Sequence, residues 1–176
     1  MLYELECEAL VKLPGIGSRS ILSLTKSKSK LSKALIADNT GVISAYTNVG
    51  NKLECKWRTQ AVPYEITAIE YEPTSRRIYY AFTHIIKAID RKGKQVFHSD
   101  TFTTETLSVL KINSLSQVLY AAGVFVLNML LIKDNTFGDA GSYIFQDKIS
   151  DIILPRNSSF CIVSLHGKDI VLLKDT

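Results

Sequence analysis

The chain has 176 residues, of which 46% are apolar and 22% are charged, and its formal net charge is +4. This length and composition suit one soluble globular domain with a core of its own. An excess of 21 basic over 17 acidic residues is too small to indicate a nucleic-acid-binding protein, which needs a clustered basic face.

Cysteine and histidine are too sparse and too scattered to indicate a metal site or a disulfide framework. No two cysteines form a CxxC pair, and their number is odd. We therefore expect reduced thiols in the cytosol and no metal site, cofactor or catalytic residue. The residues concerned are Cys7, Cys55, Cys161, His84, His98 and His166.

The first 17 residues allow two interpretations. From Tyr3 to Leu13 apolar and polar residues alternate with one exception, which indicates a half-buried strand, and Pro14-Gly15 then marks a turn. The stretch LVKLPGIG also resembles the hairpin of a helix-hairpin-helix DNA-binding module, which needs a helix after Gly17. Alternating serines make SRSILSLT a poor helix. We expect a turn between two strands and no nucleic-acid partner. The acidic start also lacks the features of a secretory signal.

The rest of the chain alternates short apolar runs with turn signals. KSKSK (26–30) is typical of a solvated loop. Val, Ile, Leu, Tyr and Phe dominate the runs, and Gly, Asn, Pro and Ser separate them, which predicts strands and turns. We expect strands at 33–37, 42–47, 52–57, 65–71, 76–82, 85–90, 95–100, 105–112, 117–127, 129–134, 143–147, 148–155, 160–167 and 168–175, with a longer loop, NTFGDAGS, at 135–142.

The longest apolar stretch, Val118–Ile132, is too short for a membrane span. It has 15 residues and is interrupted by Asn128, whereas a membrane helix needs about 20 residues. Two buried strands with a turn near Asn128 explain the stretch better. We therefore expect no direct membrane span.

An internal repeat of about 43 residues groups these strands. AYTNVGNKLEC and AIDRKGKQVFH align with Gly50 on Gly93, an offset of 43, and LIKDN and LLKDT align with an offset of 41. Ile66, Leu107 and Ile149 each begin a unit, at steps of 41 and 42. Four strands in about 40–45 residues correspond to one blade of a β-propeller.

The predicted fold is therefore all-β, a partial β-propeller of about three and a half four-stranded blades. A lipocalin-like closed barrel is the alternative fold, but it requires no such repeat. No stretch has a helical apolar period, which disfavours parallel α/β folds.

The last predicted unit stops at LLKDT, after its third strand. Closed propellers have about 4–8 blades, so we expect residues 1–176 to be the N-terminal part of a propeller domain, truncated within its fourth blade. Alternatively, a partner supplies the missing faces. We expect the chain alone to aggregate, because an open arc exposes apolar faces and edge strands.

Three stretches in order resemble the N-terminal propeller of the Bardet–Biedl syndrome 7 family, subunits of the BBSome. They are KALIADNTGVISAY, DRKGKQVFHSDTFTTE and YIFQDKISDIILP, which contain the turn Ala37–Val42, the run Lys92–Phe97 with Thr104-Glu105, and the run Asp147–Pro155. The resemblance covers nearly the whole chain. Compared with the family, the loop NTFGDAGS looks long, and the later blades, coiled coil, appendage and helical parts are absent.

The resemblance implies a non-enzymatic scaffold or adaptor in a complex that moves membrane proteins into and out of cilia. It implies partnership with other BBSome subunits, including another propeller subunit, and contact with membrane-protein cargo tails through the complex. It also implies a cytoplasmic location, at the cilium, its base or peripherally at its membrane.

No residue pattern indicates enzyme chemistry. His84 and His166 fall near the second turns of their units and could be close in space, but a lone histidine in a turn is usually solvated or hydrogen-bonded. VSLHGKD lacks the GxSxG motif around Ser164, and KDNTFGDAG does not match a calcium loop. The sequence leaves a second hypothesis open, a small-molecule-binding or hydrolytic all-β protein.

Residue type indicates candidate contacts with partner proteins. Aromatic and arginine side chains near turns are the candidates, namely Trp57, Arg58, Arg76 and Arg77. For Trp57 we favour packing in the core or between blades.

Overall fold

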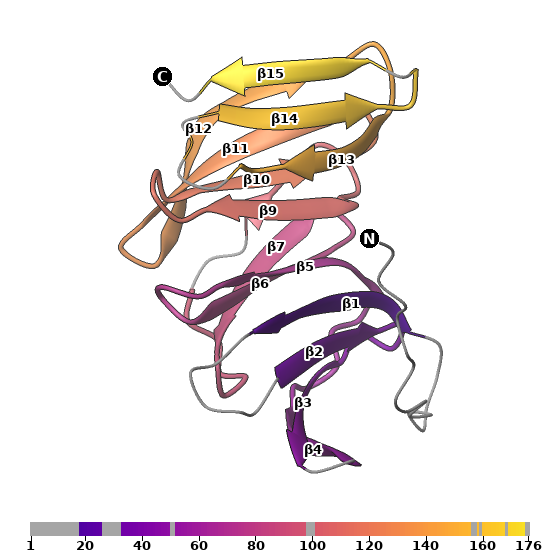
Figure 1. Cartoon of the computed structure of the whole chain (residues 1–176), viewed down its shortest axis with the longest axis vertical. Coiled ribbons are helices and arrows are strands. Elements are labelled where there is room, and N and C mark those ends of the chain that lie inside the picture. Colours follow the sequence, from indigo (N-terminus) through magenta and orange to yellow (C-terminus); the bar gives the residue numbers. More distant parts are fainter. Residues whose placement is uncertain are drawn as a thin grey trace, which may run out of the picture.

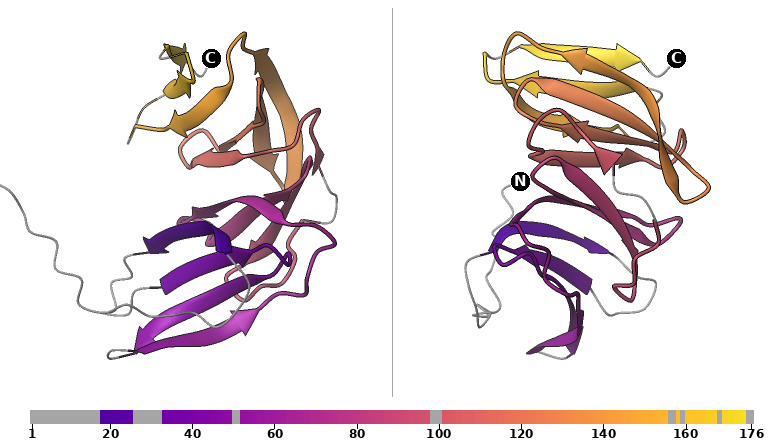
Figure 2. Two further views of the ribbon diagram at one scale, coloured as in Figure 1. Left: turned by 90° about the vertical axis from the view of Figure 1, so that its right-hand side faces the viewer. Right: turned by 180° about the vertical axis from the view of Figure 1, so that it is seen from behind.

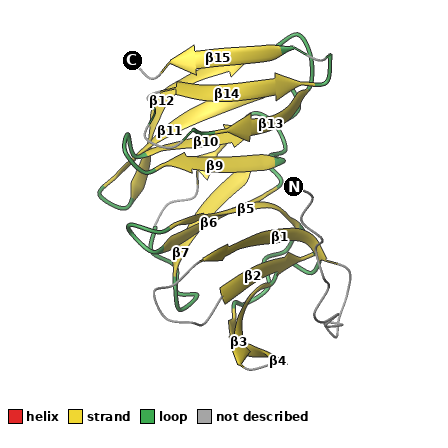
Figure 3. Ribbon diagram, in the orientation of Figure 1, coloured by secondary structure: helices red, strands yellow, loops and turns green. Residues whose placement is uncertain are grey.

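The computed structural model describes residues 18–25, 33–49, 52–97, 101–155, 158, 160–167 and 169–174. Within these ranges all regular structure is β-strand, and Figure 3 shows strands joined by loops and turns. The predicted strand at Tyr3–Leu13 and the Pro14-Gly15 turn lie outside the described residues, as do Gly50, Cys7 and His98.

Fifteen described strands form four separate antiparallel sheets, which we call blades 1 to 4. In each blade the strands pair in chain order. Blade 1 contains β1 (Ser18–Thr25), β2 (Lys33–Asp38), β3 (Ile43–Val49) and β4 (Lys52–Arg58); blade 2 contains β5 (Ile66–Glu72), β6 (Arg77–Phe82), β7 (Ile85–Asp90) and β8 (Thr101–Phe102). Blade 3 contains β9 (Val109–Asn113), β10 (Val118–Ala122), β11 (Val126–Lys133) and β12 (Thr136–Ile144); blade 4 contains β13 (Ile149–Ile153), β14 (Phe160–Leu165) and β15 (Ile170–Lys174).

The separation of the sheets confirms the partial propeller and argues against a closed barrel. In a lipocalin-like barrel the strand ladder would run continuously from one unit into the next, whereas here no ladder joins two blades in the described part of the chain. Figures 1 and 2 show the blades succeeding one another as an arc, with blade 1 at one end and blade 4 at the other. β1 is a strand where a helix-hairpin-helix module would need its second helix, so the DNA-hairpin alternative is wrong.

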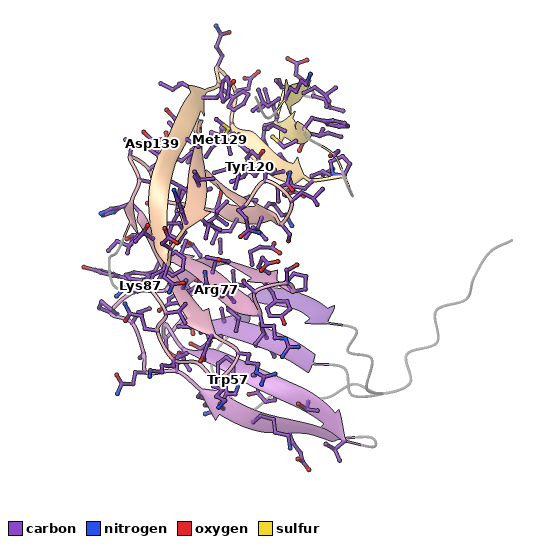
Figure 4. The ribbon with its side chains drawn as sticks, turned by 90° about the vertical axis from the view of Figure 1, so that its left-hand side faces the viewer. Trp57, Arg77, Lys87, Tyr120, Met129 and Asp139 are labelled. Carbon is purple, nitrogen blue, oxygen red and sulfur yellow. The ribbon has the colours of Figure 1, made fainter. Side chains whose placement is uncertain are left out.

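The hydrophobic core lies between the blades, as expected for sheets that cannot bury both faces alone. Three clusters of buried side chains fill the three successive interfaces. Between blades 1 and 2 they include Ile43 and Ile78; between blades 2 and 3, Tyr79 and Leu119; between blades 3 and 4, Tyr120, with Met129 packed against the cluster. Figure 4 shows Tyr120 and Met129 on the blade 4 side of blade 3, whereas Asp139 lies on the outer strand β12.

The turn between β2 and β3 is held by the side chain of Asp38. Asp38 accepts hydrogen bonds from the N–H groups of Thr40 (2.9 Å) and Val42 (3.0 Å), which holds the turn between β2 and β3. Gly41 in that turn has φ +80°, and a Cβ there would lie 2.7 Å from the Tyr64 carbonyl oxygen, so the position requires glycine.

Three element predictions were wrong. NTFGDAGS is not a loop: a tight turn at Asp134 and Asn135, both with positive φ, leads directly into β12. QVFHSD is not the fourth strand of blade 2, because Gln95 makes only an isolated bridge and β8 begins at Thr101.

The third correction concerns the longest apolar stretch. Its turn lies at Gly123–Phe125, where Gly123 N–H donates to Val126 C=O (2.9 Å). Asn128, expected near a turn, lies within β11 opposite Ala121. Its side-chain amide donates to the Ala121 carbonyl (3.4 Å), and this bond lets a polar residue occupy a half-buried strand position.

Candidate functional site

Trp57 packs between blades, as favoured from the sequence. It lies on β4 of blade 1 and is packed against the buried cluster shared by blades 1 and 2. A Cβ at Gly93, in the turn after β7 of blade 2, would lie 3.1 Å from ring atom Cε3 of Trp57. Because the ring occupies this interface, Trp57 is a packing residue rather than a free contact for a partner.

Arg77 also joins two blades. Its guanidinium donates to Asn135 Oδ1 in the β11–β12 turn of blade 3 and lies 5.4 Å from the centroid of the Phe97 ring. The hydrogen bond joins blade 2 to blade 3, whereas the cation–π contact lies within blade 2 and holds the guanidinium in place. Arg77 is therefore engaged within the protein.

Arg58 and Arg76 are the predicted contact residues that remain exposed. Hydrogen bonding to the side chains of Tyr46 and Cys55 raises the pKa of Arg58 and keeps it charged. Arg76 lies in the β5–β6 turn with φ +57°. Both are arginines on the surface, the residue type that protein interfaces favour.

His84 and His166 occupy equivalent turns, two blades apart. Both side chains are exposed, and the backbone of each turn is tied down: Thr103 N–H donates to His84 C=O, and His166 N–H donates to Lys148 C=O, both at 2.9 Å. Blade 3 separates blades 2 and 4, so the fold does not bring the two histidines into one site.

In the described ranges no cluster of three or more His, Cys, Asp or Glu side chains could hold a metal ion. No helix in those ranges has the length and apolar character needed to cross a membrane.

A polar contact that the sequence analysis missed lies between blades 2 and 3. Glu72, the last residue of β5, is fully buried, and its carboxylate accepts hydrogen bonds from the N–H groups of Thr74 (2.8 Å) and Ser75 and from Ser114 Oγ (2.9 Å) of blade 3. Burial acts to raise the pKa of Glu72, but the hydrogen bonds from Ser75, Thr74 and Ser114 outweigh it and hold that pKa below its usual value.

Asn113 makes the corresponding contact one blade further on. It ends β9, accepts from Leu115 N–H (3.0 Å), and donates from Nδ2 to the carbonyl of Ser158 in blade 4 (3.2 Å). The ends of β5 and β9, the first strands of blades 2 and 3, thus each connect to the next blade. The repeat could have revealed this pattern, because Glu72 and Asn113 occupy the same position in successive units.

Glu70 faces the same interface, but its pKa is raised, whereas that of Glu72 is lowered. Its carboxylate lies 3.9 Å from Lys111 Nζ on β9. Burial raises the pKa of Glu70 to about 7, and the nearby Lys111 ammonium only partly offsets this effect. Glu70 therefore titrates near neutral pH within the blade 2–blade 3 interface.

Blade 4 exposes an apolar face whose residue types resemble those buried between the other blades. Ile153 (52% exposed), Ile170 (69%) and Leu172 (65%) lie on the face of blade 4 that points away from blade 3. In blade 3, the positions equivalent to Ile170 and Leu172 are Leu127 and Met129, which pack against blade 4. Blade 4 therefore exposes apolar side chains on the face that points away from blade 3.

Comparison with known proteins identifies the family. The family model of the BBS7 β-propeller matches residues 20–174, which run through all four blades. The chain belongs to the BBS7 β-propeller family. The expected resemblance is thereby confirmed, and the BBS7 β-propeller match ends within β15 of the fourth blade.

Solved structures support the fold of this BBS7 β-propeller chain. A chain in the crystal structure of the mitotic checkpoint complex aligns with a TM-score of 0.67 at 7% identity, over 82% of this chain and 47% of that chain. The computationally designed Ika4 protein aligns with a TM-score of 0.69 at 12% identity, over 96% of this chain and 99% of its own. No curated protein matches the sequence.

Proposed function

We propose that this chain is a non-enzymatic scaffold or adaptor of a BBSome-like complex that traffics membrane proteins to and from cilia. The observation that carries the proposal is the family match, which spans residues 20–174 and therefore all four blades. Interfaces filled by packed side chains and by contacts such as Glu72–Ser114 suit a rigid support for protein contacts.

The proposed partners are other BBSome subunits, including another propeller subunit, with cargo tails reached through the assembled complex. The proposed location is the cytoplasm and the cilium, its base or the cytoplasmic side of its membrane. The exposed arginines Arg58 and Arg76 are candidate contacts, because arginine is enriched in protein interfaces.

We also propose that residues 1–176 form the N-terminal part of a propeller domain that stops within its fourth blade. The support is that blade 4 has three strands where the other three sheets have four, and that Ile170 and Leu172 are exposed at positions that blade 3 buries. An in-frame coding sequence continuing past Thr176 with further four-stranded units would support this proposal; a stop codon at that point would contradict it.

Affinity purification of the tagged chain from ciliated cells tests the scaffold role. We expect BBSome subunits to be enriched over a control with tagged Ika4, which has a similar fold at 12% identity. Charge reversal at Arg76, which is exposed in the β5–β6 turn, should weaken the enrichment without changing the melting temperature. If no subunit exceeds the control, the proposal fails. A large thermal stabilisation by a metal or a metabolite would instead support the small-molecule alternative.

A further inference from the structure

Two turns at one end of blade 2 gather four exposed basic side chains, which we call the basic patch. One end of the β6–β7 ladder pairs Arg77 with Asp90, and the β5–β6 and β7–β8 turns begin directly beyond this pair. The register therefore brings the two turns to the same end of the blade. The residues of the basic patch are Arg76, in the first turn, and Arg91, Lys92 and Lys94, in the second.

The backbone of both turns is held by carboxylates. Asp90 Oδ1 accepts hydrogen bonds from the N–H groups of Lys92 (2.7 Å) and Lys94 (3.0 Å), and Glu72 holds the β5–β6 turn in the same way. Burial acts to raise the pKa of Asp90, but the hydrogen bonds from Lys94 and Lys92 and the charges of both lysines outweigh it and hold that pKa below its usual value. The basic side chains thus extend from ordered backbone, which reduces the entropy lost when a partner binds.

The charge of the basic patch is only partly compensated within the protein. In the described ranges no ion pair engages a residue of the patch, because the pairs there join Lys56 to Glu54 and Lys111 to Glu70. Asp90 lies close enough to Lys92 and Lys94 to interact with their charges. One carboxylate against four cations leaves an excess of positive charge at this end of blade 2.

The equivalent turns of blade 3 have a different character. The β9–β10 turn, Ser114–Gln117, contains no charged residue, and the β11–β12 turn exposes Asp134. Arg77 donates a hydrogen bond to Asn135 Oδ1, which places this acidic turn beside blade 2. The basic patch therefore belongs to blade 2 and is not a property of every blade.

The exposure of the basic patch does not depend on where the chain ends. Blades 1 and 3 cover both faces of blade 2, through the clusters that contain Ile78 and Tyr79. Further blades of a propeller would adjoin blade 4 or blade 1, so they would leave the turns of blade 2 uncovered.

We infer that the basic patch of blade 2 binds an acidic segment of a partner protein, with Arg76 and Arg91 as the main contacts for its carboxylates. A guanidinium can bind a carboxylate through two parallel hydrogen bonds, whereas an ammonium acts as a compact charge. Lys92 and Lys94 therefore add attraction with less directional preference. The inference goes beyond the proposed function and does not depend on it.

The charges around the basic patch favour a narrow acidic chain over other anionic partners. On the blade 3 side, Asp134 and Asp139 are exposed alongside one lysine, Lys133, and Figure 4 shows Asp139 on β12 beyond Arg77. These carboxylates disfavour a broad anionic surface such as a membrane, but a single extended chain can pass between them and blade 1. Four cations are also fewer than the phosphate contacts that nucleic-acid-binding proteins commonly make.

Fluorescence anisotropy with a labelled hexaglutamate peptide tests the inference, and a hexaglutamine peptide is the control probe. We expect the 176-residue chain to bind hexaglutamate, with an affinity that falls as the NaCl concentration rises, and not to bind hexaglutamine. The double variant Arg76→Gln/Arg91→Gln should bind hexaglutamate at least about fivefold more weakly. Its melting temperature should match that of the wild type, because both side chains are exposed in turns.

Lys148→Gln/Lys174→Gln is the matched control, because it removes the same charge from exposed positions outside the basic patch. The Lys148 carbonyl accepts from His166 N–H beside the β14–β15 turn, at the opposite end of the strands, and Lys174 ends β15. This variant should keep the wild-type affinity.

Sedimentation with vesicles that contain phosphatidylserine tests the membrane as the alternative partner. No binding of hexaglutamate, an equal loss of affinity in the two double variants, or tighter binding to the vesicles than to the peptide would overturn the inference.

Discussion

Replacing Glu70 by glutamine is expected to change how the stability of the protein depends on pH. Burial between blades 2 and 3 raises the pKa of Glu70 to about 7 from an ordinary value of 4.5. The folded protein therefore binds this proton more tightly than the unfolded chain does. The stabilising contribution of the protonated carboxyl is complete below about pH 4.5 and is lost as the pH rises through 7.

The size of the effect follows from the two pKa values. One pKa unit corresponds to about 1.4 kcal/mol, so ionisation of Glu70 lowers the free energy of unfolding by about 2 kcal/mol at pH 6 and about 3 kcal/mol at pH 8. Glutamine keeps the shape of the side chain and carries no charge. The free energy of unfolding of the variant should therefore rise relative to that of the wild type by these amounts as the pH rises. At pH 8 the difference corresponds to a melting temperature about 6–12 °C higher for the variant.

The assay is urea or thermal unfolding of the wild type and Glu70→Gln at pH 5, 6, 7 and 8. Glu54→Gln is the control, because Glu54 is exposed on β4 and pairs at 2.7 Å with an exposed Lys56, which contributes little. The reasoning would be refuted by a stability difference between Glu70→Gln and the wild type that stays constant across this pH range.

Three further substitutions probe the blade interfaces and turns. Glu72→Ala leaves three partly buried donors without their acceptor and should cost about 2–3 kcal/mol by urea unfolding, with a much smaller additional loss in the double variant with Ser114→Ala. Gly41→Ala forces a side chain into the Val62 and Tyr64 carbonyls at φ +80° and should cost more than about 2 kcal/mol, whereas Gly138→Ala, whose nearest neighbour is 3.8 Å away, should cost less than about 1 kcal/mol. Trp57→Ala should lower stability by about 2–4 kcal/mol in the same assay, and full retention of stability would show that the ring does not bind blade 2.

The strand pattern was predictable because it depends on neighbours in the sequence. Alternating apolar residues and turn residues such as Asp38 and Gly41 act over a few positions, so most strands of all four blades were found. The prediction was wrong where local composition conflicts with pairing. Thr136–Ile144 reads as a polar loop with two glycines, yet it is a strand because β11 supplies a complete partner edge.

The sequence by itself determined the all-β class, the repeat of about 43 residues and the family. Each depends on local composition and on how the same local patterns repeat along the chain. Only the tertiary structure decided which polar residues join the blades. Glu72 and Ser114 are 42 residues apart, and Arg77 and Asn135 are 58 apart, so no local pattern connects them. Stacking the sheets around an axis brings the strand ends and turns of neighbouring blades together, and it also determines that Glu70 is buried.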